Sequence, residues 1–412
     1  MARLRLAIIV SHPVQYIAPL HRRLACREDL AVRVFFTWHA GDEPMFDRGF
    51  RQELAWDVPL TEGYGFEPVA NTAADPGTHH FFGLRNPALV ERVLAWKPDV
   101  VIVYGWAWCS HLLALRAFYQ RQMPVLFCGD SHLLDRDRLT GARWRAKRAV
   151  LRRVFRWPVG FLVVGSANRA YYQAFGVPAD RLHRFAHTID VQRFSKPADQ
   201  LDSEATRWRR ELGIPEDAIV LLFAGKFEPK KQPLELMGLV AALPNPRIVL
   251  ILVGNGPLRP QIEAFAATQP SRFRVLPFQN QSRMPVVYRL GDLFVLPSAH
   301  GETWGLAVNE ALACGRPVLV SDRVGCAVDL VDRSCGDIFD AKGMMRLPGI
   351  LGQLAQNPCR VMAMRHAARA RAALFDTAVG ERNIVDAIAA IAPMRNAAKP
   401  ELGVGMNVER HG

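Results

Sequence analysis

The feature that most constrains the fold is a strand–loop–helix–strand unit between Leu293 and Asp322. The apolar run Leu293–Leu296 ends at a Pro-Ser pair, which stops a strand, and a polar loop follows. Apolar residues then recur at helical spacing from Thr303, the expected cap, to Gly315, which ends the helix before a second apolar strand. A helix that joins two buried strands in this way is typical of a parallel α/β sheet.

Two glutamates, Glu302 in the loop and Glu310 in the helix, flank the expected helix N-terminus. Open parallel sheets bind ligands beyond the carboxyl ends of their strands, and a helix N-terminus there favours an anion. Carboxylates on both sides of an anion site suit a nucleotide sugar, whose hydroxyls lie on both sides of a phosphate group. The alternative is that Glu310 belongs to a buried hydrogen-bond network and that Glu302 is a solvated loop residue.

This unit resembles the signature of the retaining glycosyltransferases of family four (glycosyl transferases group 1), which have the GT-B fold. The signature is a glutamate, seven intervening residues, a second glutamate, a run of small residues and then Gly-x-Pro-Val. The chain matches it in order at these positions: Glu302, Glu310, Ala311, Gly315, Pro317 and Val318. The resemblance implies an α/β GT-B protein, in which two Rossmann-like doubly wound domains face a central cleft.

Composition agrees with a two-domain globular protein. The chain has 412 residues, half of them hydrophobic, which is enough for two cores and excludes a disordered protein. The formal net charge of +13 predicts an acidic partner: nucleic acid, an anionic membrane surface or a phosphate-bearing substrate. Seven scattered cysteines argue against a disulfide framework or a zinc site and for a reducing compartment.

The first apolar run is expected to be a buried strand rather than a signal peptide, and no run is long enough to cross a bilayer. We therefore expect a cytoplasmic protein that is soluble or peripheral at the inner membrane face.

Short apolar runs alternate with helical patterns in both halves, as in open doubly wound sheets. In the first half we expect strands at Leu4–Val10, Val32–Thr37, Val100–Tyr104, Val125–Cys128 and Phe161–Val164. In the second half we expect them at Ile219–Ala224, Ile248–Val253, Val275–Pro277, Leu293–Leu296 and Val318–Val320. The irregular stretch Phe46–Phe82 is expected to form loops near the cleft, and residues 195–200 are expected to form a linker before a helix at Glu204–Leu212.

The predicted domain plan has four parts. Residues 1–195 form an acceptor-binding Rossmann-like domain, and residues 202–372 form a nucleotide-sugar-binding one. Residues 373–395 form a helix that crosses back to the first domain, as is common in GT-B enzymes. Residues 397–412 are expected to be a disordered tail.

Two lysines after the first strand of the second half are the expected catalytic cations. Gly225 and Lys226, with Lys231 five positions on, match the family's Gly-Arg or Gly-Lys followed by a lysine. Two cations at one strand end can neutralise a diphosphate and stabilise the charge on a departing nucleotide. The alternative is a pair of surface lysines beside a turn.

The remaining donor contacts follow the next strand ends. Three of them provide a backbone that a ligand can approach closely: Gly254, Asn255 and Gly256. The resemblance assigns further donor contacts to Phe278 near the base, to Glu310 at the ribose and to the amides around Trp304, Gly305 and Leu306 at the diphosphate. Ser298 and Thr303 are also expected to contact the donor. It places Glu302 on the donor sugar.

Polar residues that follow strands of the first half are candidates for the acceptor site. His12 and Gln15 follow the first strand, and Asp130 and His132 follow the fourth. Family members often have a histidine or a His-Asp pair in such loops, so the resemblance suggests acceptor contacts at His12, Gln15 and Asp130 and a catalytic role for His132. A histidine after a strand can equally be structural, and which of Asp130 and His132 contacts the substrate stays open.

Other nucleotide and metal sites are not indicated. The Ser-His-Pro-Val sequence after the first strand lacks the glycines of a dinucleotide-binding fingerprint, and no P-loop motif is present. Asp135 and Asp137 form an Asp-x-Asp triplet like the metal-binding one of GT-A enzymes, but a solvated turn is the favoured interpretation. We therefore expect no metal and no cofactor apart from the nucleotide-sugar substrate, with UDP or GDP as the carrier.

The most basic stretch is Arg143–Trp157. As a helix it places Trp144, Leu151, Val154 and Phe155 on one side, with Val150 beside them. The simplest interpretation is a helix packed on the sheet with a basic solvated face. The functional interpretation is contact with an anionic membrane surface or a phosphorylated glycan. No nucleic-acid motif accompanies the charge, so no nucleic-acid partner is expected.

Together these patterns predict a metal-independent, retaining glycosyltransferase that moves a hexosyl-type sugar from a nucleotide diphosphate to a hydroxyl of a glycan or lipid-linked acceptor. A sugar-nucleotide hydrolase or epimerase on the same fold is the alternative. A basic protein that docks on membranes or nucleic acid without catalysis is a third reading.

Overall fold

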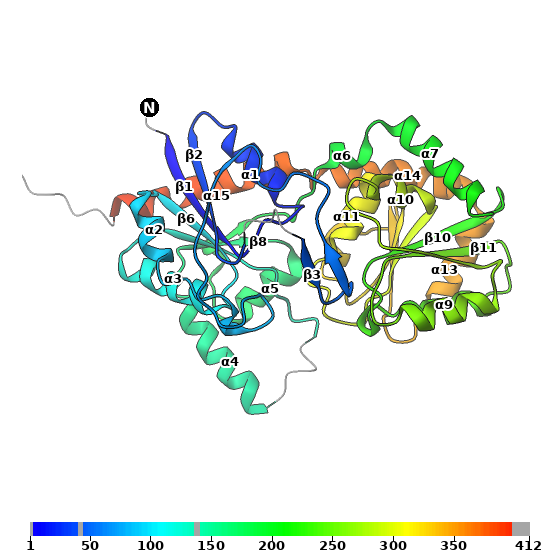
Figure 1. Ribbon diagram of the computed structural model, residues 1–412, viewed down its shortest axis with the longest axis horizontal. Coiled ribbons are helices and arrows are strands. Elements are labelled where there is room, and N and C mark those ends of the chain that lie inside the picture. The colour runs from blue at the N-terminus through cyan, green and yellow to red at the C-terminus, as the bar shows by residue number, and fades with distance from the viewer. Residues whose placement is uncertain (1–2, 40–43, 136–140, 398–412) are drawn as a thin grey trace, which may run out of the picture.

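The computed structural model describes residues 3–39, 44–135 and 141–397, which fold into two α/β domains (Figure 1). Asp137 and residues 398–412 of the predicted tail lie outside the described residues, whereas Ala397 ends a helix. Among the helices described, none combines the length and the apolar character that crossing a membrane requires.

The amino-terminal domain contains a parallel sheet of seven strands in the order β5-β2-β1-β6-β7-β8-β9. Its strands are β1 (Leu4–Val10), β2 (Leu30–Phe36), β5 (Gly65–Pro68), β6 (Val100–Tyr104), β7 (Val125–Cys128), β8 (Gly160–Val163) and β9 (Leu182–Arg184). Its helices are α1 (Ala18–Ala25), α2 (Leu89–Ala95), α3 (Cys109–Gln120), α4 (Gly141–Val154) and α5 (Ser166–Ala174). Short 3-10 turns lie at Phe81–Gly83 and Ala179–Arg181.

The carboxyl-terminal domain contains a parallel sheet of six strands in the order β12-β11-β10-β13-β14-β15. Its strands are β10 (Ile219–Ala224), β11 (Ile248–Val253), β12 (Phe273–Leu276), β13 (Leu293–Leu296), β14 (Val318–Ser321) and β15 (Gly336–Phe339). Its helices are α7 (Ala198–Glu211), α8 (Pro233–Ala242), α9 (Arg259–Thr268), α10 (Met284–Leu290), α11 (Leu306–Ala313), α12 (Ala327–Leu330), α13 (Leu347–Gln356) and α14 (Pro358–Ala373), with a 3-10 turn η4 (Pro229–Lys231).

The central strands of both sheets are continuous apolar runs, because helices cover the sheets on both faces. In β1, alternate residues enter different cores: Leu6 and Ile8 pack into one, and Ala7 and Ile9 into the other. The core that contains Leu6 continues across the domain seam into the carboxyl-terminal domain. In each sheet the strand order reverses next to the first strand, which is where open α/β sheets bind ligands.

The chain passes between the domains twice, and the two passages are hydrogen-bonded to each other. The first runs through α6 (Val191–Ser195), and the second leads into α15 (Thr377–Ala397), which packs against α1, β8 and β9 (Figure 1). The amide of Ile189 donates to the carbonyl of Phe375 at 3.1 Å, and Thr377 donates to the carbonyl of Ile189 at 3.1 Å. The described part of the final helix therefore returns to the amino-terminal domain.

Several local predictions were wrong. The helix expected from Glu204 begins at Ala198, directly after a proline, so the expected linker is much shorter. The stretch expected to form loops contains an antiparallel hairpin, β3 (Met45–Asp47) and β4 (Gln52–Leu54), as well as β5. Thr303 does not cap α11, because Gly305 stands at the cap with a φ of +96°.

The helix predicted for Arg143–Trp157 is α4, which projects from the amino-terminal domain (Figure 1). Leu151, Val154 and Phe155 are buried as predicted, and Trp144 is half-buried. Val150 is not part of the packed face, since it is 52 % exposed. The helix therefore presents an apolar residue as well as basic ones to solvent.

Candidate active site

Lys231 and Glu302 meet at the point where the strand order of the carboxyl-terminal sheet reverses. Lys231 lies in η4 after β10, and Glu302 lies in the loop after β13, which pairs with β10. The Nζ atom of Lys231 is 2.7 Å from Oε2 of Glu302, and the hydroxyl of Ser298 donates to the same oxygen at 3.1 Å. Both charged side chains keep some exposure, 17 % and 18 %. These contacts hold the carboxylate and the ammonium next to each other, beyond the carboxyl ends of β10 and β13.

Lys226, the second predicted cation, is paired with a residue of the other domain. Its Nζ atom lies 2.9 Å from Oδ1 of Asp47 in β3 and 5.1 Å from the centre of the Phe50 ring. Burial opposes ionisation of Asp47, but hydrogen bonds from Lys226 and from the Phe50 amide outweigh it and lower the pKa of the carboxyl. Lys226 and Lys231 thus follow the same strand but hold different carboxylates.

Asp47 belongs to a segment that covers the strand ends of the carboxyl-terminal domain. We name residues 45–57, the β3–β4 hairpin and its continuation, the cleft hairpin; β3 lies between the two domains in Figure 1. The side chain of Asn255 donates to Gln52 at 3.0 Å. The ring of Phe278 packs edge-on against Phe50, with centroids 4.7 Å apart. Two predicted donor residues, Asn255 and Phe278, therefore contact the cleft hairpin.

The end of the cleft hairpin is also hydrogen-bonded to the carboxyl-terminal domain. The side chain of Asn280 donates to the carbonyl of Ala55 at 2.7 Å, and the amide of Ser282 donates to Asp57 at 3.0 Å. No local pattern marks these partners, because each pair joins residues more than 200 positions apart. For this reason the cleft hairpin could not be predicted from local sequence.

Glu310 is buried in α11, with 9 % of its surface exposed. The hydroxyl of Tyr288 in α10 donates to its Oε2 atom at 2.6 Å. Burial raises the pKa of Glu310, although Tyr288 and the nearby Arg193 favour its charged form. The structure thus satisfies one carboxylate oxygen inside the protein, as in the alternative interpretation, and Tyr288 is a partner that the sequence analysis did not identify.

The loop before α11 is shaped by its packing. A side chain at Gly305 would place a Cβ atom 2.9 Å from Val324, and Leu306 is the first residue of the helix. Trp304 is only 3 % exposed, donates from Nε1 to Asn309 at 2.9 Å and packs its ring against His187. The side chain of Trp304 is therefore a core residue at the domain seam, and only its backbone lies beside the helix N-terminus.

The glycine-rich loops touch each other. A Cβ atom on Gly254 would lie 1.9 Å from the carbonyl oxygen of Gly225, and one on Gly256 would lie 2.8 Å from the amide nitrogen of Phe227. The absent side chains therefore allow the loops after β10 and β11 to pack together. This packing brings Lys226 and Asn255 to one edge of the sheet.

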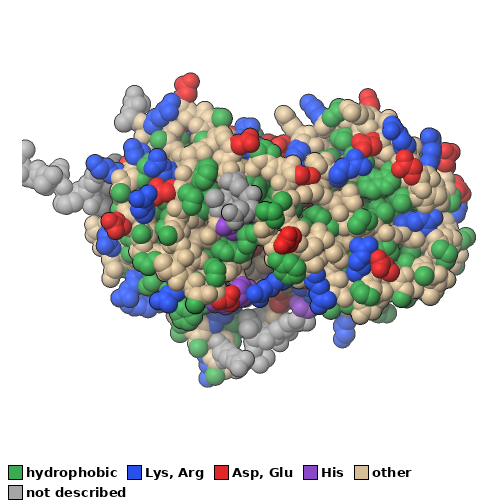
Figure 2. All heavy atoms as spheres, viewed as in Figure 1, with side chains coloured by type: hydrophobic (Ala, Val, Ile, Leu, Met, Phe, Trp, Pro, Cys, Tyr) green, Lys and Arg blue, Asp and Glu red, His purple; other side chains and the backbone are tan. Residues whose placement is uncertain are grey.

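The predicted acceptor residues occupy two different places. His12 and Gln15 line a cavity of about 570 Å³ between the domains, together with Trp38, Trp56 and, from the other domain, Lys226; the surface is hollowed between the domains in Figure 2. The Oγ atom of Ser11 lies 2.9 Å from Nδ1 of His12. Burial and the neighbouring His39 lower the pKa of His12 to about 4, so its ring is neutral at pH 7.

Asp130 and His132 contact the loop that carries Glu302. The hydroxyl of Thr303 donates to Asp130 at 2.7 Å, and Nε2 of His132 lies 3.3 Å from the backbone carbonyl of Glu302. Neither residue lines the His12 cavity. The structure therefore separates the four predicted acceptor-side residues into a cavity pair and a pair that holds the Glu302 loop.

Asp135 of the Asp-x-Asp triplet accepts a hydrogen bond from the amide of Gly301 at 2.9 Å. Among the residues that the structure describes, the grouped His and acidic side chains close enough to hold a metal ion are Asp75, His79 and His80. They lie on a loop whose residue His79 also lines the edge of the His12 cavity. Lys226, Lys231 and Glu302 are not members of this group.

Two family models match the chain, one over each domain. Residues 13–186 match the Glycosyl transferase 4-like domain, and residues 204–371 match Glycosyl transferases group 1. The D-inositol 3-phosphate glycosyltransferase of Xylanimonas cellulosilytica is 30 % identical over 207 residues, which are 49 % of each protein. That of Thermobispora bispora is 33 % identical over 179 residues, 39 % of this chain and 42 % of the relative. The chain spans about half the length of the curated relatives it matches.

Solved structures share the fold over nearly the whole chain. Anabaena Alr3699/HepE, crystallised with UDP and glucose, has a TM-score of 0.68 at 17 % identity and covers 94 % of this chain and 100 % of its own. Sucrose-phosphate synthase from Thermosynechococcus elongatus has a TM-score of 0.70 at 18 % identity and covers 96 % of this chain and 100 % of its own. The predicted GT-B fold is confirmed. The chain therefore has the GT-B fold, its amino-terminal domain matches the Glycosyl transferase 4-like domain, and its carboxyl-terminal domain matches Glycosyl transferases group 1.

Proposed function

We propose that this protein transfers a sugar from a nucleoside diphosphate to a hydroxyl of a glycan or lipid-linked acceptor, with retention at the anomeric carbon. The observation that carries the proposal is the pairing of Lys231 with Glu302 at the sheet's switch point, with Lys226 on the same strand end. A sugar diphosphate needs cations at its phosphates and acceptors at its hydroxyls, and this edge offers both within a few ångströms.

The diphosphate takes Lys226 and Lys231 as its partners, beside the N-terminus of α11. Two ammonium groups and a helix dipole stabilise the charge that gathers on the departing nucleotide, as a divalent ion does in other transferases. On this basis we propose transfer without a metal. A diphosphate bound at Lys226 competes with Asp47, so donor binding requires the cleft hairpin to give up that ion pair.

Glu302 holds the donor sugar, and Glu310 holds the ribose hydroxyls with the oxygen that Tyr288 leaves free. Glu302 is fixed by Lys231 and Ser298. A carboxylate held in this way supports positioning of the sugar, and we propose attack from the front face without a protein nucleophile. Phe278 lies where the base binds, with a uracil or guanine nucleotide as the expected carrier. HepE, which is solved with UDP-glucose, supports a nucleotide sugar of this kind.

The His12 cavity is the proposed acceptor site. It reaches from His12 and Trp38 to Lys226, so it joins the donor edge directly. Aromatic faces such as those of Trp38 and Trp56 suit a sugar ring, and neutral His12 can accept or donate a hydrogen bond to a hydroxyl. The relatives named for D-inositol 3-phosphate, a phosphorylated polyol, are consistent with an acceptor of this chemistry.

We further propose that α4 brings the protein to anionic membranes, where lipid-linked acceptors reside. Arg145, Arg148, Arg152 and Arg153 are exposed on α4, and Val150 stands among them. Lys and Arg side chains gather at this lower edge of the amino-terminal domain in Figure 2. Basic residues near an anionic surface contribute about 1 kcal/mol each, so flotation with phosphatidylserine vesicles should be strong at low salt and lost at high salt.

The decisive experiment is Lys231→Ala, with Lys230→Ala as its matched control. Lys230 is the next residue but pairs with Glu228 and is 40 % exposed. Loss of the Lys231 ammonium should reduce the transfer rate by about 10² or more, the scale of one transition-state contact. The control should stay near wild type. Equal rates for both variants would remove Lys231 from the chemistry.

A second measurement identifies the donor and separates transfer from the alternatives. A ligand that binds the folded state raises its melting temperature, so UDP, GDP, ADP and TDP sugars can be compared directly. A hydrolase or epimerase would form product without an acceptor, whereas a transferase needs one. A docking protein without catalysis would show no nucleotide binding.

A further inference from the structure

A second cavity, of about 540 Å³, opens at the opposite edge of the carboxyl-terminal sheet. Asp292, which immediately precedes β13, and Arg316, which closely precedes β14, line it. The strands are parallel, so this is the amino edge of the sheet, whereas Lys231 and Glu302 follow strands at the carboxyl edge. Five arginines from α7, α10, α14 and the β14 approach line the cavity: Arg209, Arg289, Arg316, Arg365 and Arg369. We name it the arginine cavity.

Two carboxylates in the arginine cavity share four of its arginines. Asp292 pairs with Arg209 at 3.2 Å and with Arg365 at 2.6 Å. Asp202 pairs with Arg289 at 3.1 Å and with Arg316 at 2.9 Å.

The fifth arginine, Arg369, forms no ion pair with any carboxylate in the described part of the chain. Five guanidinium groups against two carboxylates leave a surplus of three positive charges. Such an excess in a concave site attracts anions.

The deepest arginines also have hydrogen-bond donors without acceptors. Arg289 is 2 % exposed and Arg316 is 6 % exposed. The Nε atoms of Arg316 and Arg365 are buried and have no acceptor within residues 3–39, 44–135 and 141–397, whereas Nε of Arg289 faces Asp202. Buried donors are rarely left in this state, because each costs about 1–3 kcal/mol. Burial, together with repulsion from Arg365, also lowers the pKa of Arg316 to about 10, which an added anion would reverse.

We propose that the arginine cavity binds a small anion that carries a phosphate group. Phosphate oxygens accept several hydrogen bonds at once, and the planar forks of arginine match them in pairs. The cavity volume lies in the range of small-ligand sites. The inference does not depend on the proposed function, since none of its residues belongs to the candidate active site.

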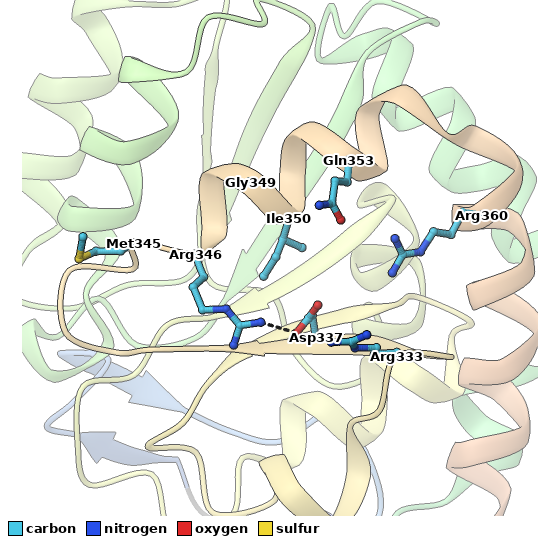
Figure 3. A pocket seen from close by; sticks show the side chains of 8 residues that line it. All are labelled: Arg333, Asp337, Met345, Arg346, Gly349, Ile350, Gln353 and Arg360. Atoms are coloured by element: carbon cyan, nitrogen blue, oxygen red, sulfur yellow. Dashed lines mark ion pairs between the residues drawn. The ribbon is translucent and has the colours of Figure 1, made fainter.

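A neighbouring cavity shows what distinguishes this site. The cavity of Figure 3, about 430 Å³ between α13 and β15, is lined by Arg333, Arg346 and Arg360. Arg346 points toward Asp337 in Figure 3, and its Nη2 atom lies 4.0 Å from Oδ1 of Asp337. In that cavity none of the described guanidinium nitrogens is both buried and without an acceptor. Charge alone is therefore common on this surface, whereas the arginine cavity combines it with buried guanidinium donors that have no acceptor among the described residues.

The location of the arginine cavity gives its ligand a structural consequence. Arg289 donates from Nη1 to the carbonyl of Phe194 at 2.8 Å and from Nη2 to that of Ser195 at 3.5 Å. These carbonyls end α6, directly before the chain enters the carboxyl-terminal domain. An anion on Arg289 would thus contact the side chain that fixes this passage.

The test is calorimetric titration with inorganic phosphate, and with glycerol 3-phosphate as a phosphate ester, at constant ionic strength in chloride. Arg369→Gln removes an exposed arginine that has no carboxylate partner among the described residues, so the variant should fold. It should weaken phosphate binding at least tenfold. Arg360→Gln is the matched control: it removes the same charge from the same helix, α14, at the cavity of Figure 3, and should bind like wild type.

Lys231→Ala separates the arginine cavity from the candidate active site. Phosphate binding that survives Lys231→Ala and falls with Arg369→Gln supports the proposal, whether the tighter ligand is the free ion or the ester. The proposal is overturned if wild type binds neither ligand, if Arg369→Gln and Arg360→Gln bind alike, or if Lys231→Ala alone abolishes binding. Failure of nucleotide-sugar binding would not affect this result, because the two sites share no residue.

Discussion

The pairing of Asp47 with Lys226 predicts that Asp47→Asn will tighten donor binding. Asp47 Oδ1 accepts hydrogen bonds from the amides of Gly49 at 2.8 Å and Phe50 at 2.9 Å, which shape the turn of the cleft hairpin. The amide oxygen of asparagine can keep these bonds, so the substitution removes mainly the negative charge. Lys226 then no longer has to exchange one anion for another when the diphosphate arrives.

The magnitude follows from the geometry of this ion pair. At 2.9 Å the gross attraction is about 6 kcal/mol for an effective dielectric constant near 20. The side chains of Lys226 and Asp47 are 32 % and 28 % exposed, so solvent screening and desolvation offset most of it. A net contribution of about 1 kcal/mol remains, which corresponds to a dissociation constant for the nucleoside diphosphate that is about fivefold lower in Asp47→Asn.

Calorimetric titration with the nucleoside diphosphate measures this change, and Glu53→Gln provides the matched control. Glu53 lies in β4 of the same hairpin and is exposed. The Glu53→Gln variant should bind the nucleotide like wild type, although it loses the same negative charge as Asp47→Asn. The difference between the variants should also shrink as salt rises, because screening weakens the competing ion pair. Unchanged or weaker binding in Asp47→Asn would refute the idea that Asp47 competes with the ligand.

Three other predictions address the site and its stability. Transfer should proceed at its normal rate in EDTA. Loss of activity in EDTA would instead support the interpretation of the Asp135 triplet as a metal site. Tyr288→Phe should raise the pKa of Glu310 further and weaken nucleotide binding by about 1–3 kcal/mol, measured by calorimetry, and equal affinity would show that Glu310 does not depend on this bond. His21 is 3 % exposed, neither ring nitrogen has a hydrogen-bond partner among the described residues, and burial lowers its pKa to about 3. His21 of the unfolded chain binds a proton at higher pH than His21 of the folded protein, so stability should fall as the pH drops from 6.5 toward 3. In thermal melts His21→Leu should lose less stability than wild type over that window. Parallel curves of melting temperature against pH for the two proteins would contradict this.

The strands that were predicted well are those buried on both faces. Six strands have the predicted bounds: β1, β6, β7, β10, β11 and β13. A continuous apolar run with a turn at its end leaves little choice of where the strand begins and ends. β9 and β15 were not predicted, and neither was the β3–β4 hairpin. Those strands are three or four residues long and partly polar, so they form through pairing with neighbours rather than through a pattern of their own.

The candidate site was predictable where its residues follow a local motif. Glu302 and Lys231 each follow a strand at a recognisable spacing, and the sheet topology then brings them together. Asp47 and Tyr288 could not be found in this way, because no local sequence pattern indicates which residues they contact. Asp47 reaches Lys226 across 179 positions and from another domain. Trp304 shows the opposite case: it lies inside the recognisable motif, but its side chain packs in the core.

The doubled domain passage described above has a mechanical consequence. The chain crosses the seam at Ile189 and again at Asp376, and backbone hydrogen bonds tie the crossings to each other. A rotation of one domain about this double crossing keeps these bonds, whereas a slide of one domain past the other would break them. Such a rotation would separate Asp47 from Lys226 and return them to contact.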